Sequence, residues 1–474
     1  MIRIPDYTIG EQISASESSR VYRGYANLDK KPVIIKVPAA ESPSRPDLAK
    51  IRWEYEIANS LEIEGIVKPV ALISSPNCAL ILEDFGGFSL SSLVDVQKIE
   101  LLLGLRIAIR LAKTIGRIHQ KGIIHKDVKL ANIIINPETE QVKLSDFSIA
   151  SRISGEKQPH VKPDLLEGTL TYMAPEQTGR MNRSIDHRAD LYSFGISLYK
   201  MFTGVLPFED TGMVELIHCH MAIPPQPPCK KDPNIPEQLS DIILKLLAKN
   251  AEDRYQSAFG LGHDLEECFT QLKTEKKVKR FVLGQNDIPT TMQIPEKLYG
   301  RETELAELVD AFRQTAQGKT EFLLVKGAPG IGKSVLINEL HKPVIEQKGF
   351  FTSGKFDQFK HDLPYIAIRQ AFTDLTRQLL CESTESISAW GEKIKKNIGP
   401  NGQILIDLIP ELKHIVGTQP PVESLPPTQS QNRFNIVFNE FVNVFARKEH
   451  PLVLFLDDMQ WADWATLKLV EHLV

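Results

Sequence analysis

The fold of this chain is decided by the stretch HKDVKLAN, at residues 125–132. It places a histidine, an aspartate, a lysine and an asparagine at fixed offsets, a combination expected by chance in about one chain per thousand at average composition. Two shorter motifs follow it in order, DFS at 146–148 and APE at 174–176. Independent residues would not fall into this order, so we interpret the three motifs as parts of one catalytic apparatus.

The order and spacing of these motifs resemble those of a protein kinase, and the resemblance covers residues 7–269. It implies an α+β protein-kinase fold with a small β-rich N-lobe and a helical C-lobe. It also implies transfer of the ATP γ-phosphoryl group to a serine or threonine of a protein, which requires alignment and charge neutralisation more than covalent chemistry. By its place in the motif, Asp127 accepts the proton of the substrate hydroxyl, and Lys129 marks the serine/threonine subclass.

The resemblance also assigns the nucleotide and metal ligands. Asp146 and the amide oxygen of Asn132 supply the oxygen ligands that Mg²⁺ prefers. The segment from Glu83 to Phe85 is expected to form the hinge that meets adenine through backbone groups. The cofactors implied are therefore ATP and Mg²⁺.

A lysine is also needed to pair with the α- and β-phosphates, and Lys36 ends a strand-like run as the family requires. Its partner is expected to be Glu54, on a helix over residues 47–61 whose apolar residues recur at three- and four-residue steps. Glu56 is the alternative, although it lies on another face of that helix.

Two further matches to the family are structural. Asp190 is expected to cap the backbone of the catalytic loop, and Arg254 is expected to pair with Glu176. The rest of the first part is predicted from periodicity and proline content. This predicts strands at 21–23, 32–37 and 79–82, helices at 101–119 and 239–249, and a proline-rich ordered loop at 223–236.

The sequence departs from the family at the loop that covers the phosphates. The aligned stretch SASESSRV, residues 14–21, has serine at all three positions where the family has glycine. Glycine permits positive φ and close approach of the backbone to phosphate, whereas serine restricts those conformations. Glu17 adds a negative charge near the loop tip. We expect an atypical nucleotide lid.

Two other departures concern control of activity. Ser148 replaces the glycine of the DFG motif, and Lys126 replaces an arginine that usually pairs with an activation-loop phosphate, without its bidentate fork. The candidate hydroxyls of that loop are Ser151, Ser154, Thr169 and Thr171. The alternative left open is a pseudokinase that scaffolds partners, which the loop serines favour and the retained charged residues oppose.

A second constellation begins with GAPGIGKS at residues 327–334, between an expected strand at 321–325 and an expected helix at 334–347. This is the context in which a P-loop is credible: Lys333 reaches the β- and γ-phosphates and Ser334 binds Mg²⁺. Backbone N–H groups of the glycine-rich turn are expected to cradle the phosphates, and its glycines are Gly327, Gly330 and Gly332.

Further downstream the apolar strand at 452–456 ends in Asp457 and Asp458. It resembles a Walker B motif, which implies Asp457 on Mg²⁺ through water and Asp458 polarising the attacking water. YGRE at 299–302 resembles the entry to AAA-like and STAND signalling ATPases, and GKFDQ at 354–358 resembles the ATPase module of large bacterial hybrid serine/threonine–histidine sensor kinases. Those kinases continue into sensor and histidine-kinase modules, so such modules or response regulators are the expected partners besides protein substrates.

The predicted organisation is a kinase domain at 7–269, a charged linker at 270–297 and a P-loop ATPase domain at 298–474. The chain ends sixteen residues after Asp458. A P-loop sheet of this class needs further strands, at ~30 residues for each βα unit. We therefore expect an incomplete α/β sheet with an exposed apolar edge, and we do not expect robust hydrolysis from it.

Composition limits the other classes of function. The net charge of −4 gives no electrostatic case for a nucleic-acid partner. Five scattered cysteines, none in a CxxC pair, disfavour a zinc site or a disulfide framework. No apolar run approaches the ~20 residues of a membrane span, so we expect no integral membrane segment and a cytoplasmic protein.

Overall fold

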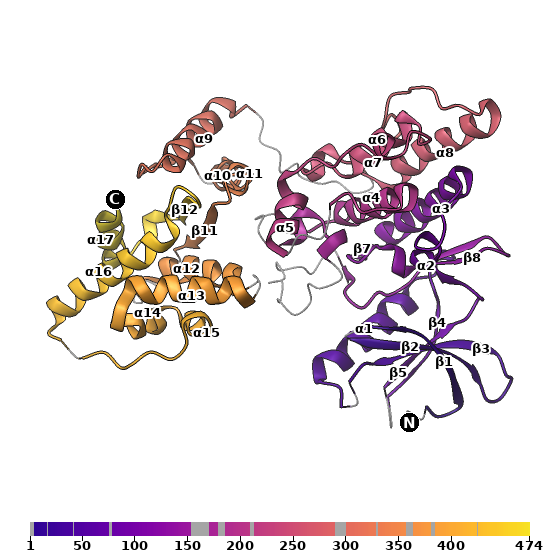
Figure 1. The fold of residues 1–474 in the computed structure, drawn as a ribbon, viewed down its shortest axis with the longest axis horizontal. Helices are drawn as coiled ribbons and strands as arrows, with labels where there is room; N and C mark the ends of the chain where they lie inside the picture. The colour runs from indigo at the N-terminus through magenta and orange to yellow at the C-terminus, as the bar shows by residue number, and fades with distance from the viewer. Residues whose placement is uncertain are drawn as a thin grey trace.

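The computed structural model describes most of the chain, and Figure 1 shows its arrangement. The described residues are 4–16, 18–40, 42–74, 78–152, 170–178, 185–208, 213–289, 300–328, 330–356, 364–380, 384–423 and 425–474. Several predictions concern residues outside these ranges, namely those for Glu17, Ser154, Thr169, Tyr299, Asp357 and Gln358, and for residues 290–297 of the linker.

The first part of the chain begins with a five-stranded antiparallel sheet in the order β1-β2-β3-β5-β4. Alternate residues of its central strands face opposite sides. Ile35 and Ile81 are buried on one face, whereas Leu80 packs on the other face with Ile51 of helix α1. The elements are β1 (Tyr7–Ala15), β2 (Ser19–Ala26), β3 (Pro32–Pro38), α1 (Arg45–Ser60), β4 (Pro69–Ile73) and β5 (Ala79–Glu83).

Helix α1 confirms the predicted helix, and its N-terminus explains where it begins. Ser44 and Asp47 form a capping box, in which each side chain bonds the backbone N–H of the other residue. The residues that α1 buries, Ile51, Glu54 and Ile57 among them, are three or four positions apart. One apolar stripe therefore docks the helix on the sheet, and Glu54 lies within that stripe.

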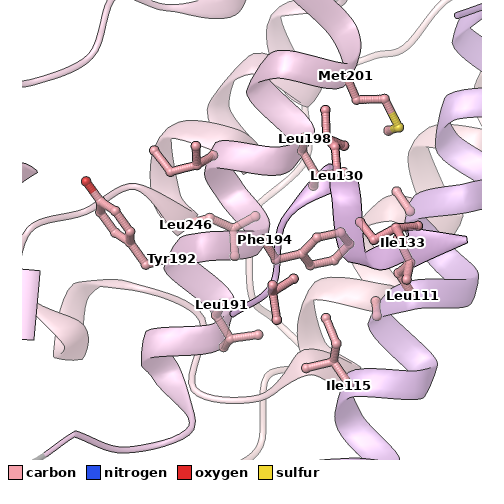
Figure 2. Close-up of a cluster of buried hydrophobic side chains, with 14 of the residues drawn as sticks. Leu111, Ile115, Leu130, Ile133, Leu191, Tyr192, Phe194, Leu198, Met201 and Leu246 are labelled. Carbon is pink, nitrogen blue, oxygen red and sulfur yellow. The ribbon is translucent and has the colours of Figure 1, made fainter. Parts of the chain in front are cut away.

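The second lobe is helical, with short strand pairs beside the catalytic loop. Figure 2 shows its core, where Phe194 of α4 lies among Leu111, Ile133 and Leu246 from three other elements. Each such side chain contributes about 1.5–3 kcal/mol by burial. The helices are α2 (Leu90–Val94), α3 (Leu101–Gln120), α4 (Arg188–Thr203), α5 (Met213–Ala222), α6 (Pro228–Lys231), α7 (Glu237–Leu246) and α8 (Ala258–Glu275). The strands are β6 (Phe88–Ser89), β7 (Ile123–Ile124), β8 (Ile133–Asn136), β9 (Gln141–Leu144) and β10 (Ser151–Arg152).

The proline-rich stretch 223–236 differs in one detail from the prediction of a loop. Within it the residues of α6 form a single helical turn, which begins at Pro228. Proline is tolerated at the first position of a helix, where its missing N–H has no intrahelical partner to lose. The other residues of the stretch are non-helical.

The expected linker also begins differently from a free tether. Helix α8 continues to Glu275, and Val278, Phe281 and Leu283 then pack against the core of the second lobe. The carboxylate of Asp287 accepts hydrogen bonds from the Gln256 N–H at 2.6 Å and from the Ser257 hydroxyl at 2.8 Å. A few apolar residues within the charged run are thus enough to hold the described part of the segment, up to residue 289, on the lobe.

The last part of the chain surrounds a parallel pair of strands, β11 (Phe350–Lys355) and β12 (Leu452–Asp457). Helices pack around this pair in two apolar clusters, centred on Phe372 and on Phe312. They are α9 (Glu302–Ala316), α10 (Lys333–Asn338), α11 (His341–Glu346), α12 (Ile366–Leu380), α13 (Thr384–Ile398), α14 (Gly402–Leu408), α15 (Lys413–Val416), α16 (Pro427–Phe445) and α17 (Trp464–Leu473).

The predicted strand at 321–325 is wrong for this structure, in which these residues are irregular. Phe322, Leu323 and Leu324 are 56%, 50% and 57% exposed. A strand requires a neighbour for its backbone groups, and among the described residues β12 is paired with β11 alone.

The predicted helix at 334–347 is divided into α10 and α11. Pro343 explains the division, because its ring clashes with the carbonyl of the residue four positions earlier, Glu339, and it has no N–H to donate. Glu339 is the residue at which α10 is capped.

Candidate functional site

The catalytic loop is held by a buried carboxylate from helix α4. Asp190 accepts hydrogen bonds from the backbone N–H groups of His125 at 2.8 Å and Lys126 at 2.7 Å. It also lies 2.8 Å from the ring of His119. These bonds confirm the predicted capping role. The catalytic loop that they hold directly follows β7.

Asp127 is buried and polarised by two neighbours. Its Oδ2 accepts from Asn132 Nδ2 at 2.9 Å and lies 2.7 Å from the Lys129 ammonium. Its Oδ1 is buried without a hydrogen-bond partner among the described residues. Leaving a buried carboxylate oxygen without a partner is costly, so this atom is available to accept a proton or hydrogen bond from a ligand.

Lys36 joins the two lobes at the site. Its ammonium lies 2.7 Å from Glu54 of α1 and 2.9 Å from Asp146. The Phe147 backbone N–H also lowers the pKa of Glu54. The structure therefore brings together the residues predicted from three distant segments, and Glu56, the alternative partner, is exposed.

Burial and ion pairing act against each other in this cluster. Burial raises the pKa of Glu54 to about 7, although Lys36 acts in the opposite direction. Burial opposes the charge on Lys36, but Glu54 and Asp146 outweigh it and raise its pKa. Burial also opposes the charge on Asp146, but Lys36 outweighs it and holds the pKa of this carboxyl well below its ordinary value. Asp146 is thus the carboxylate held most firmly in its charged form.

The predicted hinge follows β5, at the junction of the lobes. The Glu83 carboxylate accepts from the Lys68 N–H at 2.8 Å and from Lys143 at 2.6 Å. The Phe85 carbonyl accepts from Asn136 Nδ2 at 2.7 Å. The contacts of Lys143 with Glu83 and of Asn136 with Phe85 therefore connect the two lobes on either side of Asp84.

The serine-rich loop forms a turn at the end of the β1–β2 hairpin. The Ser16 hydroxyl accepts from the Ser19 N–H at 3.1 Å, and the Ser16 N–H donates to the Ser19 carbonyl at 2.8 Å. Ser14, Ser16 and Ser19 all have negative φ. The described part of the loop therefore adopts a conformation that serine allows, and a side-chain hydroxyl holds it.

Two residues of this region were not predicted from the sequence. Gln177 donates from Nε2 to the Lys126 carbonyl at 3.1 Å and accepts from the Ala174 N–H at 3.0 Å, which ties the end of the activation segment to the catalytic loop. The Trp53 indole N–H donates to the Ala150 carbonyl at 2.7 Å. Nothing in either local sequence pattern indicates these bonds.

The predicted pair of Arg254 and Glu176 is confirmed. The two terminal guanidinium nitrogens, Nη1 and Nη2, donate to the carboxylate at 2.6 and 2.8 Å, and the arginine side chain is fully buried. Of the candidate activation-loop hydroxyls, Ser151 lies in β10 and Thr171 lies in a short 3₁₀ turn at Leu170–Tyr172.

The P-loop region has the left-handed turns that its glycines permit. Gly330 and Gly332 have φ of 79° and 94°, and Gly332 caps the N-terminus of α10. The Lys333 ammonium donates to the carbonyls of Gly327 at 3.0 Å and Ala328 at 3.1 Å.

The Walker B residues meet the P-loop at the end of β12. Ser334 Oγ lies 3.2 Å from Asp457 Oδ2, so the two predicted Mg²⁺ ligands are adjacent. Asp458 is paired with Lys355 at 3.2 Å, a partner that the sequence did not indicate.

The donor chemistry of both sites suits a hard cation. In the first site Asn132 donates twice through Nδ2, to the carbonyl and the carboxylate of Asp127, so its amide oxygen is the atom that could ligate a cation. Carboxylate, amide and hydroxyl oxygens, with ligands completed by phosphates and water, are what Mg²⁺ takes. Among the described residues no group of three or more acidic, histidine or cysteine side chains forms an all-protein metal site.

The fold and this site define a two-lobed phosphotransferase architecture with a P-loop module after it. A family profile described as "Protein kinase domain" matches residues 7–265. Because this match covers more than half of the chain, the chain belongs to the protein kinase family. A second profile, "AAA ATPase domain", matches residues 297–474.

Similar proteins share one or both parts. Hybrid signal transduction histidine kinase G of Dictyostelium discoideum is 32% identical over 457 residues, which cover 78% of this chain and 13% of the relative. Serine/threonine-protein kinase Pkn1 of Myxococcus xanthus is 31% identical over 272 residues, 56% of this chain and 38% of the relative. Serine/threonine-protein kinase PknB of Mycobacterium tuberculosis strain H37Rv is 30% identical over 266 residues, which cover 55% of this chain and 42% of the relative. The chain thus spans less than half the length of each of these relatives.

No helix within the described ranges is both long and apolar enough to cross a membrane.

Proposed function

We propose that this chain is a protein serine/threonine kinase of a signalling pathway, and that its AAA-type module regulates it. The observation that carries the proposal is the assembled cluster of Lys36, Glu54 and Asp146 beside Asp127, whose Oδ1 is buried and unpaired within the described part of the chain. Bound ATP with Mg²⁺ supplies the transferable phosphoryl group and neutralises its charge.

Each protein group has a separate task in this proposal. Asp127 Oδ1 accepts the proton of the substrate hydroxyl, and Lys129, 2.7 Å from the other oxygen, orients the carboxylate. Asp146 and Asn132 hold the metal. Lys36 orients the α- and β-phosphates, while Glu54 fixes its ammonium on the C-lobe side of the sheet.

The experiment is transfer of ³²P from γ-labelled ATP to a generic protein, with Asp127→Ala compared with wild type. Loss of a positioned general base lowers the rate by about 10²–10⁴-fold. Equal signals from the two proteins refute the proposed kinase activity and favour the second candidate, a pseudokinase scaffold. That candidate is supported by the glycine-free loop at 14–21.

The regulatory role of the ATPase module is supported by its contact with the kinase. Helix α11, which follows the P-loop helix α10, lies against α5 of the C-lobe, and Ile345 packs on the C-lobe core (Figure 1). Helix α5 in turn packs against the end of the activation segment, where the Thr178 hydroxyl is 3.7 Å from Met221 Sδ. Helices α11 and α5 therefore connect α10 through packed contacts to the residues that hold the catalytic loop, so a shift of α10 on nucleotide binding can reach them.

Lys333→Ala in the full chain tests this regulation. The substitution removes the phosphate-binding ammonium of the P-loop and leaves Asp127 untouched. We expect the protein-kinase rate at saturating ATP to change at least about fivefold, because a coupling of about 1 kcal/mol is at the low end for linked sites. An unchanged rate contradicts the switch while leaving the kinase proposal standing. Protein substrates, and sensor or histidine-kinase modules or response regulators in the same pathway, complete the proposed set of partners.

A further inference from the structure

Trp53 forms a bridge between the two lobes next to the catalytic lysine. It is the residue before Glu54 on α1, and its indole N–H donates to the Ala150 carbonyl at 2.7 Å. Ala150 lies four residues after Asp146, and it is buried, whereas Trp53 is 37% exposed. The bond therefore joins the helix that carries Glu54 to the first turn of the activation segment.

The acceptor is fixed to the C-lobe. Directly after Ala150, strand β10 pairs antiparallel with β7, with Ser151 opposite Ile124 and Arg152 opposite Ile123. Strand β7 leads into the catalytic loop. A hydrogen bond from α1 to this carbonyl thus sets the position of α1 relative to the catalytic loop that carries Asp127.

The position of α1 decides whether the ion pair between Lys36 and Glu54 forms. In protein kinases the position of that helix and the order of the activation segment are commonly controlled by phosphorylation, through arginine–phosphate pairs. Here the catalytic-loop arginine is replaced by Lys126, which has no bidentate fork for a phosphate. In this structure α1 is seated, with the Lys36 ammonium 2.7 Å from the Glu54 carboxylate.

We propose that Trp53 is a positioning residue that seats α1 through its indole N–H and thereby assembles the Lys36–Glu54–Asp146 cluster without phosphorylation of the activation loop. In this role Trp53 acts through Glu54 and not on the nucleotide or the substrate. The inference deepens the proposed kinase function and rests on it for its consequence on rate. The structural part, the seating of α1, stands on the hydrogen bond alone.

The test compares Trp53→Phe with Trp464→Phe in the full chain. Phenylalanine retains an aromatic ring but cannot donate, and Trp464, 72% exposed, controls for loss of an indole elsewhere. A sharper variant places at position 53 the sulfur analogue of tryptophan, in which sulfur replaces the N–H. A net hydrogen bond of about 1–1.4 kcal/mol corresponds to a five- to tenfold loss of kcat/KM for phosphotransfer.

A second readout separates positioning from general destabilisation. The Phe147 backbone N–H lies near the Glu54 carboxylate and favours its charged form, so the hydrogen exchange of this amide reports whether α1 is seated. We expect exchange at Phe147 to accelerate about five- to tenfold in Trp53→Phe and in the sulfur analogue, with an unchanged Tm, and not in Trp464→Phe. Phosphatase-treated wild type should keep its full rate.

The outcomes decide between the two claims. Unchanged exchange at Phe147 in the Trp53 variants overturns the inference, and so does a wild-type rate that is lost on phosphatase treatment. If wild type is no more active than Asp127→Ala, the proposed kinase function has failed, and the exchange measurement alone then decides whether Trp53 seats α1.

Discussion

Replacement of Arg254 by methionine should destabilise the C-lobe more than any surface change in the chain. Methionine nearly retains the length of the side chain but removes the guanidinium. That group is fully buried and makes two bonds to Glu176, at 2.6 and 2.8 Å. It also donates to three backbone carbonyls at 2.8–3.1 Å, those of Ala248, Arg188 and Lys249.

The magnitude follows from what the substitution leaves behind. Glu176 would be a buried carboxylate without its countercharge, which costs about 3–5 kcal/mol. Each carbonyl that loses its charged donor adds about 1 kcal/mol, partly offset by water and by the apolar methionine. Because these terms are not additive, we expect about 4–5 kcal/mol in total. A domain has only about 5–15 kcal/mol of stability, so the variant should be close to unfolding at 37 °C.

The assay is urea denaturation of the full chain followed by hydrogen exchange in peptides of α4, which separates the C-lobe from the ATPase part. Arg254→Met should lower the free energy of unfolding of α4 by about 4–5 kcal/mol. Adding Glu176→Leu should recover part of that loss, since the stranded charge is removed. A loss below about 1 kcal/mol for the single variant, or a double variant less stable than Arg254→Met, would refute the reasoning.

Two other predictions follow from individual contacts. Ser16→Ala removes the hydroxyl that accepts from the Ser19 N–H, so it should raise the KM for ATP about two- to fivefold, measured by initial rates. Ser16→Gly should do the same, and a lower KM for that variant would contradict the account of the loop. Burial lowers the pKa of Lys249 from 10.5 to about 7, and Arg254 acts in the same direction. The unfolded chain keeps a proton there that the folded chain gives up, so stability should rise with pH between about 7 and 10.5, and Lys249→Met should lose this rise in Tm while an exposed Lys468→Met should keep it.

Much of the site could be predicted because its chemistry is recorded in short motifs. Asp127, Lys129 and Asn132 lie within six residues, and their mutual geometry follows from one turn of the chain. Glu54 could be chosen over Glu56 because the two differ in helix face, which is a matter of periodicity. The Arg254–Glu176 pair, 78 residues apart, could be predicted only by resemblance to the family.

The residues that were missed act across long separations without a motif. The Trp53–Ala150 bond spans 97 residues, and the Lys355–Asp458 pair spans two strands that become neighbours only in the folded sheet. Propensity also failed at 321–325, where apolar residues indicate a strand but the described chain provides no neighbour to pair with it. For the serine loop, the expectation was based on the φ angles and the close backbone approach that glycine permits, whereas the Ser16 hydroxyl forms a hydrogen bond within the loop.

The unpaired segment at 321–325 has a thermodynamic consequence for the P-loop that follows it. Only Val325 of its apolar residues packs into the neighbouring cluster, and the P-loop is otherwise tied to β12 through the Ser334–Asp457 contact. Ordering this segment and ordering the phosphate loop are therefore linked events. By reciprocity, any strand that pairs with 321–325 and tightens nucleotide binding by some factor must itself be bound more tightly, by the same factor, when nucleotide is present. The affinity for nucleotide therefore measures whether a strand is paired with residues 321–325.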